Sequence, residues 1–299
     1  MIAARGVLAG SVPGWFNAGW TLPRQAPMDA LTPADHPLDA QALAELAQAH
    51  ALLENPGLAA RLTSALGTPL EKGIALMPAG WNQKLQVASL LALEKAAQGA
   101  IWSLDNTPGR PASQRWHKLG AAVSGGVGGF FGLAAVMAEL PVSTALIMRS
   151  IADTARSQGE DLGSEDARRA CLEVFAFGGP DSRDDAADSG YFLVRAALAR
   201  SVADAGRAVA HGVGGQATPA LLQLIHAVAA RFGVQVSQKV AVQLVPIIGA
   251  ASGALINTLF IDHYQQMARG HFTVRRLERT HGSEAVRQAW ARLDGGDGR

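Results

Sequence analysis

The 299-residue chain has little of what several common classes of protein require. Its single cysteine, Cys171, excludes an internal disulfide and a cysteine-rich zinc site. Charged residues make up only 17% of the chain, whereas roughly 25% is usual for soluble domains. A net charge of +1 provides no basic field that would attract nucleic acid. Hydrophobic residues reach 48%, which excludes wholesale disorder, since a disordered chain needs low hydrophobicity and high charge.

Motifs of familiar catalytic and binding sites are also missing. The chain has no Gly-x-Ser-x-Gly nucleophile turn and no His-Glu-x-x-His zinc motif. A glycine-rich run at 125–129 lacks the Gly-Lys-Ser/Thr ending of a phosphate loop, and the acidic stretch 181–188 lacks the spacing of a calcium hand. We therefore expect no cofactor, no metal site and no nucleic-acid partner.

The first 37 residues differ in composition from the rest of the chain. They contain five prolines together with Trp15, Phe16 and Trp20, which predicts an extended arm with aromatic anchors, packed on its own domain. The apolar stretch 7–9 is too short for the core of a secretory signal peptide. We therefore expect a cytoplasmic protein with an N-terminal arm over 1–37.

From residue 38 the hydrophobic pattern is helical. Apolar residues recur at spacings of three and four over 39–53 and again over about 83–104, and turn-forming residues follow both runs. Ser164 precedes acidic residues as a helix N-cap does, and Gly178-Gly179-Pro180 should end that helix. No stretch shows sustained strand-like alternation. The sequence predicts an all-α, multi-helix bundle forming a single domain over 38–299.

Two uncharged segments, 119–138 and 240–261, should pack against each other at the centre of this bundle. Both have about the length that spans a bilayer, but a buried core helix would have the same composition. Pro246 would kink or end a helix in the second segment. Small residues four apart give each segment a smooth face for close helix packing: Ser124, Gly125, Gly128, Gly129 and Gly132 in the first, and Gly249 and Gly253 in the second.

Isolated polar residues beside these segments are candidate site residues. Glu139 precedes Pro141, which we expect to begin a new helix, while Arg149 and Asp153 are four apart and can pair on one helical face. Such charges form either a polar pocket or relay, with Glu139 as a candidate catalytic group, or a buried ion pair that fixes helix register. Lys239 and Asn257 are further candidate binding residues.

A basic segment near the C-terminus provides the second group of candidates. His271, Arg275 and Glu278 share one face if the segment is helical, and Arg276 and Arg279 lie beside them. A histidine near a carboxylate is the minimum for acid–base catalysis, so His271 is a weak catalytic candidate. The alternatives are a structural hydrogen-bond network and contact with lipid headgroups, in which Arg275, Arg276 and Glu278 would bind.

Several of these stretches together resemble the EcsC family of bacterial proteins. The resemblance covers roughly residues 83–285. It depends on the order of weak motifs, among them Ser124–Gly132 followed by Glu139-Leu140-Pro141, then Arg149–Asp153, Cys171–Ala176, Pro246–Ala250, Ile256-Asn257 and His271–Glu278. The family is named for the third gene of an operon whose other products form an ABC transporter linked to secretion. The resemblance implies an association with membranes and transport, and it implies no catalytic residues.

Taken together, these features favour a non-enzymatic, membrane-associated helical protein that supports a transport or envelope process. It would lie at the inner face of the cytoplasmic membrane, with membrane lipid or a membrane transport protein as its partner. One alternative is an effector whose glycine-rich segments insert and permeabilise a membrane. Another is a lipid-acting hydrolase that uses Glu139 or His271. The sequence leaves the oligomeric state open.

Overall fold

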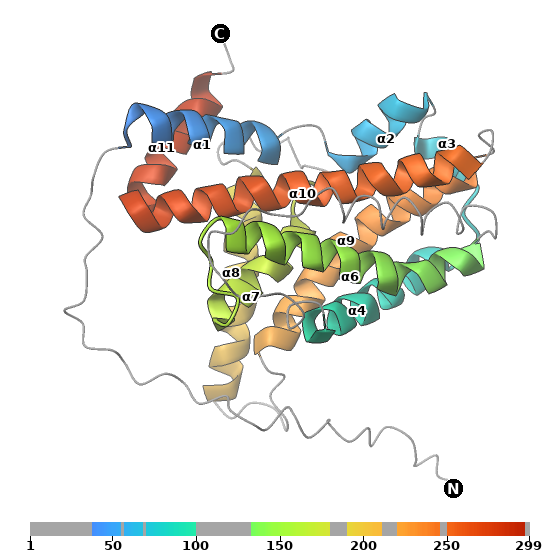
Figure 1. Ribbon diagram of the computed structural model, residues 1–299. Helices are drawn as coiled ribbons and strands as arrows, with labels where there is room; N and C mark the ends of the chain where they lie inside the picture. Colours follow the sequence, from blue (N-terminus) through green and yellow to red (C-terminus); the bar gives the residue numbers. More distant parts are fainter. Residues whose placement is uncertain are drawn as a thin grey trace, which may run out of the picture. The chain divides into compact units, whose positions relative to one another are not determined.

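The computed structural model describes residues 38–54, 57–67, 70–99, 133–179, 190–210, 220–245 and 250–296. All of them belong to the second of two units into which the chain divides, residues 35–299. The described residues fold into helices and turns without a strand, which confirms the predicted all-α class (Figure 1). The predicted arm at 1–37 lies outside them.

The helices follow one another along the chain with short connections where these are described. They are α1 (Ala40–Leu53), α2 (Leu58–Leu66), α3 (Leu70–Ala75), α4 (Trp81–Gly99), α6 (Leu133–Ser157), α7 (Glu165–Glu173), the 3₁₀ turn η3 (Val174–Ala176), α8 (Gly190–Ala210), α9 (Ala220–Leu244), α10 (Ala250–His281) and α11 (Ser283–Gly296).

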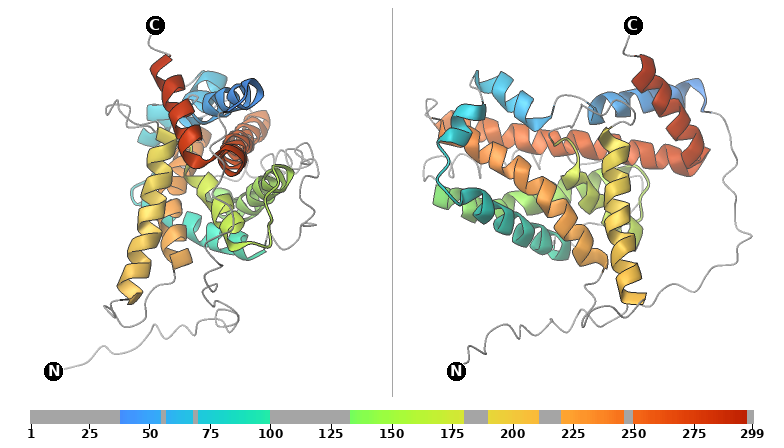
Figure 2. Two further views of the ribbon diagram at one scale, coloured as in Figure 1. Left: turned by 90° about the vertical axis from the view of Figure 1, so that its left-hand side faces the viewer. Right: turned by 180° about the vertical axis from the view of Figure 1, so that it is seen from behind.

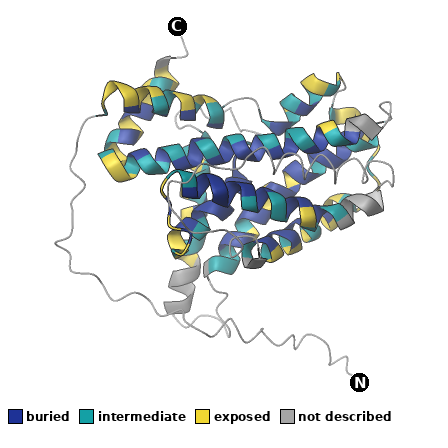
Figure 3. Ribbon diagram, in the orientation of Figure 1, coloured by how far each residue is buried: buried dark blue, intermediate teal, exposed yellow. Residues whose placement is uncertain are grey.

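The longest of these helices, α10, organises the bundle. It packs against α1, α2, α6, α9 and α11, so helices from both ends of the described chain meet on it (Figures 1 and 2). On the other side of α6 and α9 from α1, α4 packs against both of these helices. The helix faces that point toward one another are buried and the outer faces are exposed (Figure 3).

Aromatic side chains form the centre of the core where η3, α9 and α10 meet. The Phe175 ring lies 5.1 Å from Phe232 and 5.2 Å from Tyr264, between ring centroids. Phe260 packs on Tyr264 at 5.2 Å, and all four side chains are fully buried. Edge and tilted contacts of this kind add to the stabilisation from burying apolar area.

Several local predictions are confirmed. A helix begins at Ala40 with Asp39 as its N-cap, since the Asp39 carboxylate accepts a 2.7 Å hydrogen bond from the Ala42 amide. Ser164 caps α7 in the same way through the Ala167 amide, at 3.1 Å. The second predicted helix is present as α4 and ends at Gly99, followed by residues that are not described.

Two predictions about helix ends are wrong. Pro141 does not begin a helix but lies inside α6, so Glu139 is within a helix and not near its start. Buried Leu140, Ser143 and Thr144 pack this turn against the bundle, which compensates for the hydrogen bond that proline cannot donate. The helix after Ser164 ends at Glu173 and passes into η3, before the glycines that we expected to end it.

The two uncharged segments are only partly described. The glycine-rich face formed by Ser124, Gly125, Gly128, Gly129 and Gly132 lies outside the described residues, as does Gly249, while Gly253 is buried in α10. The second segment is divided between α9, which ends at Leu244, and α10, which begins at Ala250 on the far side of Pro246. Among the helices that are described, none is both long and apolar enough to cross a membrane.

Candidate functional site

A lysine buried between three helices is the first candidate site. Lys239 of α9 donates a 3.1 Å hydrogen bond to Oε1 of Glu139 from α6 and a 2.8 Å hydrogen bond to Oδ1 of Asn257 from α10. Its ammonium also lies 4.9 Å from the centroid of the Phe260 ring, a cation–π contact. We call Glu139, Lys239 and Asn257 the buried lysine cluster. Three residues that the sequence marked separately thus come together.

Burial determines the electrostatics of this cluster. The side chains of Lys239 and Glu139 are 2% and 7% exposed, and Asn257 is fully buried. Loss of solvation lowers the pKa of Lys239, and the Glu139 carboxylate opposes that shift. An ion pair enclosed in this way is costly to break, because either partner left alone is a buried charge.

Hydrogen-bonding capacity remains within this part of the bundle. The second carboxylate oxygen of Glu139, Oε2, is buried and accepts no hydrogen bond. Gln243 lies one turn from Lys239 on α9, and both its amide nitrogen and its amide oxygen are buried without a partner. The buried lysine cluster therefore joins α6, α9 and α10 inside the bundle. Glu139 and Gln243 beside it keep polar atoms that make no hydrogen bond.

The other charged residues predicted on α6 lie further along the same helix. Asp153 is buried and pairs with Arg156, which is also buried and lies one turn away. Arg149 is half-buried. The pairing of Arg149 with Asp153 that the spacing suggested stays a prediction, and Arg156 is a partner that the sequence analysis did not single out.

His271 of α10 is fully buried and packs against several aromatic rings. Its Nδ1 lies 2.9 Å from the hydroxyl of Tyr191 on α8, and the Phe177 ring lies 5.0 Å from the imidazole. Its Nε2 is 4.0 Å from a carboxylate oxygen of Glu173. Burial lowers the pKa of His271 well below its usual value, and nearby guanidinium groups lower it further. The imidazole is therefore neutral at pH 7 and enclosed, whereas a catalytic group must reach its substrate.

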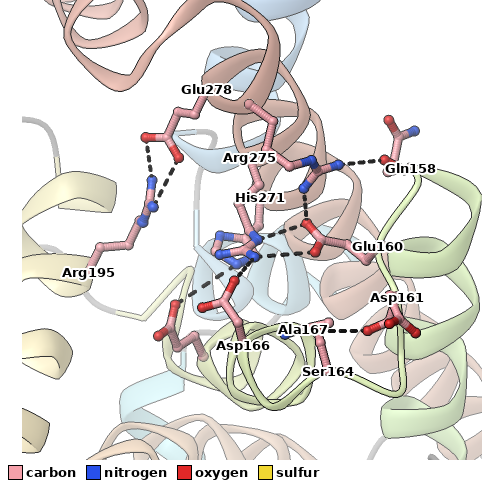
Figure 4. Close-up of polar contacts among 12 residues, drawn as sticks. Gln158, Glu160, Asp161, Ser164, Asp166, Ala167, Arg195, His271, Arg275 and Glu278 are labelled. Carbon is pink, nitrogen blue, oxygen red and sulfur yellow. Dashed lines mark hydrogen bonds and ion pairs between the residues drawn. The ribbon is translucent and has the colours of Figure 1, made fainter. Parts of the chain in front are cut away.

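The basic face of α10 forms ion pairs across the bundle, shown in part in Figure 4. Arg275 binds Glu160 through two hydrogen bonds of 2.9 and 3.2 Å and Asp166 at 2.6 Å. Glu278 accepts two hydrogen bonds from Arg195 of α8, at 3.0 and 3.1 Å. We call these contacts, together with those of Arg276 and Arg279, the α10 ion-pair network.

The two remaining arginines of this network, Arg276 and Arg279, also bind carboxylates from other parts of the chain. Arg276 binds Glu45 of α1 at 2.5 Å, and this hydrogen bond lowers the pKa of Glu45. Arg279 pairs with Glu160 and donates a 2.9 Å hydrogen bond to the carbonyl of Gln158. The arginines that we considered for lipid headgroups thus bind carboxylates of this chain. The structural-network alternative accounts for these contacts.

Sequence reasoning missed the partners in this network. Glu45, Glu160 and Arg195 are separated from their α10 partners by 231, 115 and 83 positions. Periodicity reports only which residues share a face of one helix, so it carries no signal for pairs this far apart. The acidic stretch around 160–166 was visible in the sequence, and its charge opposite to that of the α10 arginines is the one signal that could have suggested the pairing.

Cys171 is buried in α7, and burial raises the pKa of its thiol. The thiol is therefore protonated and unreactive at neutral pH. Within the described ranges, no three His, Cys, Asp or Glu side chains lie close enough together to hold a metal ion.

The fold is an all-α bundle in which Glu139 and the arginines of the α10 ion-pair network bind other charged side chains of the chain. Comparison with known families agrees with the resemblance noted in the sequence: residues 40–277 match the EcsC protein family. The chain belongs to this family. The match begins at α1, about 43 positions earlier than the resemblance suggested, and it leaves out the arm at 1–37. No curated protein and no solved structure matches the chain.

Proposed function

We propose that this protein is a non-enzymatic, membrane-associated helical protein that supports a transport or envelope process at the inner face of the cytoplasmic membrane. The observation that carries the proposal is where large aliphatic side chains are exposed. Among the described residues, those that exceed 50% exposure lie in and just after α3, in α4 and in α6: Ile74, Leu76, Val87, Leu91 and Val142. Three of these side chains lie on α4 and α6, which pack against each other, and exposed apolar side chains on adjoining helices are typical of surfaces that meet lipid or another protein.

The charged candidates support an interaction role over a catalytic one. Glu139 is bound to Lys239 in the interior, and His271 is neutral and enclosed by rings. A hydrolase would need one of these groups in contact with its substrate. The permeabilising alternative depends on the glycines of 124–132, which lie outside the described residues.

Fractionation of cells that express the protein tests the proposal. We expect the protein in the membrane pellet and its release by an alkaline carbonate wash, because attachment through side chains on a bundle surface is peripheral. Added protease should digest it in inverted membrane vesicles and spare it in intact spheroplasts. Retention after the wash would favour the membrane-inserting alternative, and recovery of all the protein without membranes would overturn the proposal.

A further inference from the structure

One outward face of α4 combines exposed aliphatic and basic side chains. Lys84, Val87, Leu91 and Lys95 follow one another at spacings of three, four and four, so they form a single line along the helix. All four are exposed, Val87 to 54% and Leu91 to 52%. We call this line the α4 stripe.

The opposite face of α4 holds the stripe in a fixed position. Leu85, Ser89 and Leu93 are fully buried where α4 packs against α6 and α9. The amide of Gln86 also donates a 3.4 Å hydrogen bond to the carbonyl of Ala230 on α9. The stripe is therefore held on the outside of the bundle by a packed inner face, and substitutions in it leave the core untouched.

The charges on the stripe indicate what it meets. A lysine lies about one turn beyond each end of the aliphatic pair, and Lys84 also contacts the ring of Trp81 at 5.3 Å from its centroid. The nearest acidic residue on α4, Glu94, is half-buried. Lysine side chains at such positions extend toward phosphate groups while their stems cover apolar surface. Aliphatic side chains between them then reach the boundary between headgroups and acyl chains.

A second copy of the chain fits this surface poorly. A twofold axis through the stripe would place lysine against lysine in either helix orientation, with no carboxylate on the stripe to compensate. A surface of anionic phospholipid instead offers phosphates to both lysines and an apolar layer to Val87 and Leu91.

We infer that the α4 stripe is a docking surface for anionic phospholipid, an inference that rests on the proposed membrane association and assigns it to named residues. It differs from the headgroup contact that the sequence suggested. That contact required the α10 arginines, which are bound to Glu160, Glu45 and Gln158. Lys84 and Lys95 are exposed and lie on the same face as the aliphatic pair.

Sedimentation of the purified full-length protein with lipid vesicles tests the inference. The vesicles are phosphatidylcholine alone or phosphatidylcholine mixed with phosphatidylglycerol. We expect wild-type protein to bind the mixed vesicles more tightly, and high salt to reduce the difference. Lys84→Gln and Lys95→Gln should each lower the affinity for mixed vesicles about fivefold, the equivalent of about 1 kcal/mol per basic residue. Arg287→Gln, an exposed basic residue on α11, is the matched control and should bind as wild type.

The aliphatic pair is tested in the same assay. Val87→Gln/Leu91→Gln should lower the affinity for mixed vesicles at least tenfold, because the polar amides remove apolar area from the bilayer contact. The matched control is Leu43→Gln/Leu193→Gln, which changes two exposed leucines on α1 and α8. Circular dichroism should show the same helix content and thermal midpoint for every variant as for wild type.

The outcomes distinguish lipid docking by the α4 stripe from membrane association in general. Wild-type binding that no stripe variant weakens overturns the stripe and leaves membrane association standing. Equal binding to both vesicle types overturns the preference for anionic lipid. If wild type binds neither vesicle yet fractionates with membranes, the partner is a membrane protein and the lipid assignment is wrong. A change of oligomeric state in the Val87/Leu91 variant would identify the stripe as a contact between copies and would also overturn the inference.

Discussion

Lys239 is enclosed so completely that its charge depends on the groups around it. Glu139, Asn257 and the Phe260 ring are the contacts that replace its lost solvation, and they come from two helices besides its own. The side chain thus connects α6, α9 and α10 at one point. Removing one charge of such a pair costs much more than removing both, since the remaining charge stays buried.

Lys239→Met is expected to lower the free energy of unfolding by about 3 kcal/mol, because it leaves the Glu139 carboxylate without its counter-ion. The double variant Glu139→Leu/Lys239→Met should recover most of this loss. Urea unfolding followed by circular dichroism measures both. Lys72→Met, at an exposed position, should stay within about 0.5 kcal/mol of wild type. Equal losses in the single and double variants would show that the two charges are not coupled.

His263 of α10 makes stability dependent on pH. Burial, with Arg61 nearby, lowers the pKa of this imidazole from 6.5 to about 4. Below pH 6.5 the unfolded chain binds a proton at His263 that the folded chain excludes, so stability present at neutral pH is lost as the pH falls toward 4. The loss from this residue approaches about 1.4 kcal/mol per pH unit within that window.

His263→Gln should therefore lose less stability than wild type between pH 7 and pH 4.5. Glutamine keeps a polar side chain at this buried position and has no proton to gain. Urea unfolding at several pH values, compared between the two proteins, cancels the titration of all other groups. Parallel curves would show that His263 is not excluded from protonation in the folded chain.

At the scale of elements, α3 and α9 pack closely at Gly73. A Cβ atom added there would lie 2.0 Å from the carbonyl oxygen of Ala241, which is backbone and cannot move without its helix. At Gly233 of α9 the added atom would instead meet the end of the flexible Gln86 side chain at 2.3 Å. Two glycines with similar clearances should thus respond in opposite ways to substitution.

Gly73→Ala is expected to destabilise the protein by about 2 kcal/mol, because α3 must move away from α9. Gly233→Ala should be neutral or should stabilise by up to about 1 kcal/mol, since Gln86 can rotate away and alanine favours the helix. Thermal unfolding of both variants provides the comparison. A similar loss in both would mean that the identity of the neighbouring atom does not decide the cost.

The sequence predicted those helix starts and ends that depend on residues close together in the chain. The helix capped by Asp39, the helix capped by Ser164 and the end of α9 at Leu244, shortly before a proline in the sequence, all follow from signals within a few positions. Pro141 was predicted wrongly because its place inside α6 depends on packing from other helices. The same holds for the candidate site. Its members Glu139, Lys239 and Asn257 could be identified as polar residues in apolar surroundings. Their contact could not be predicted, because it joins positions up to 100 apart.

At the scale of the whole molecule, α10 connects the helices into one bundle. It packs against α1 and α2 from the first part of the chain, α6 and α9 from the middle, and α11 at the end. The α10 ion-pair network adds links to α1 and α8 through Arg276 and Glu278. The predicted single domain over 38–299 is consistent with this connectivity and stays a prediction until unfolding is measured.

Urea unfolding is expected to be one cooperative transition. Circular dichroism reports on all helices, and tryptophan fluorescence includes the buried Trp290 of α11. The two signals should change together, because α1, α2, α6, α9 and α11 pack on α10 and the remaining long helices, α4 and α8, pack on α9. Two transitions, or midpoints that differ between the signals, would show that part of the bundle unfolds independently.

The packing of α1 against α10 has a consequence during synthesis of the chain. Leu46, Ala49 and Leu53 of α1 are buried in the finished protein, yet α10 begins roughly 200 residues later, which takes roughly 10–40 s at about 5–20 residues per second. Throughout that interval the apolar face of α1 has no partner from α10 or α11. The nascent chain thus exposes an apolar, aggregation-prone helix during translation. Slower elongation should therefore increase the dependence of folding on a chaperone.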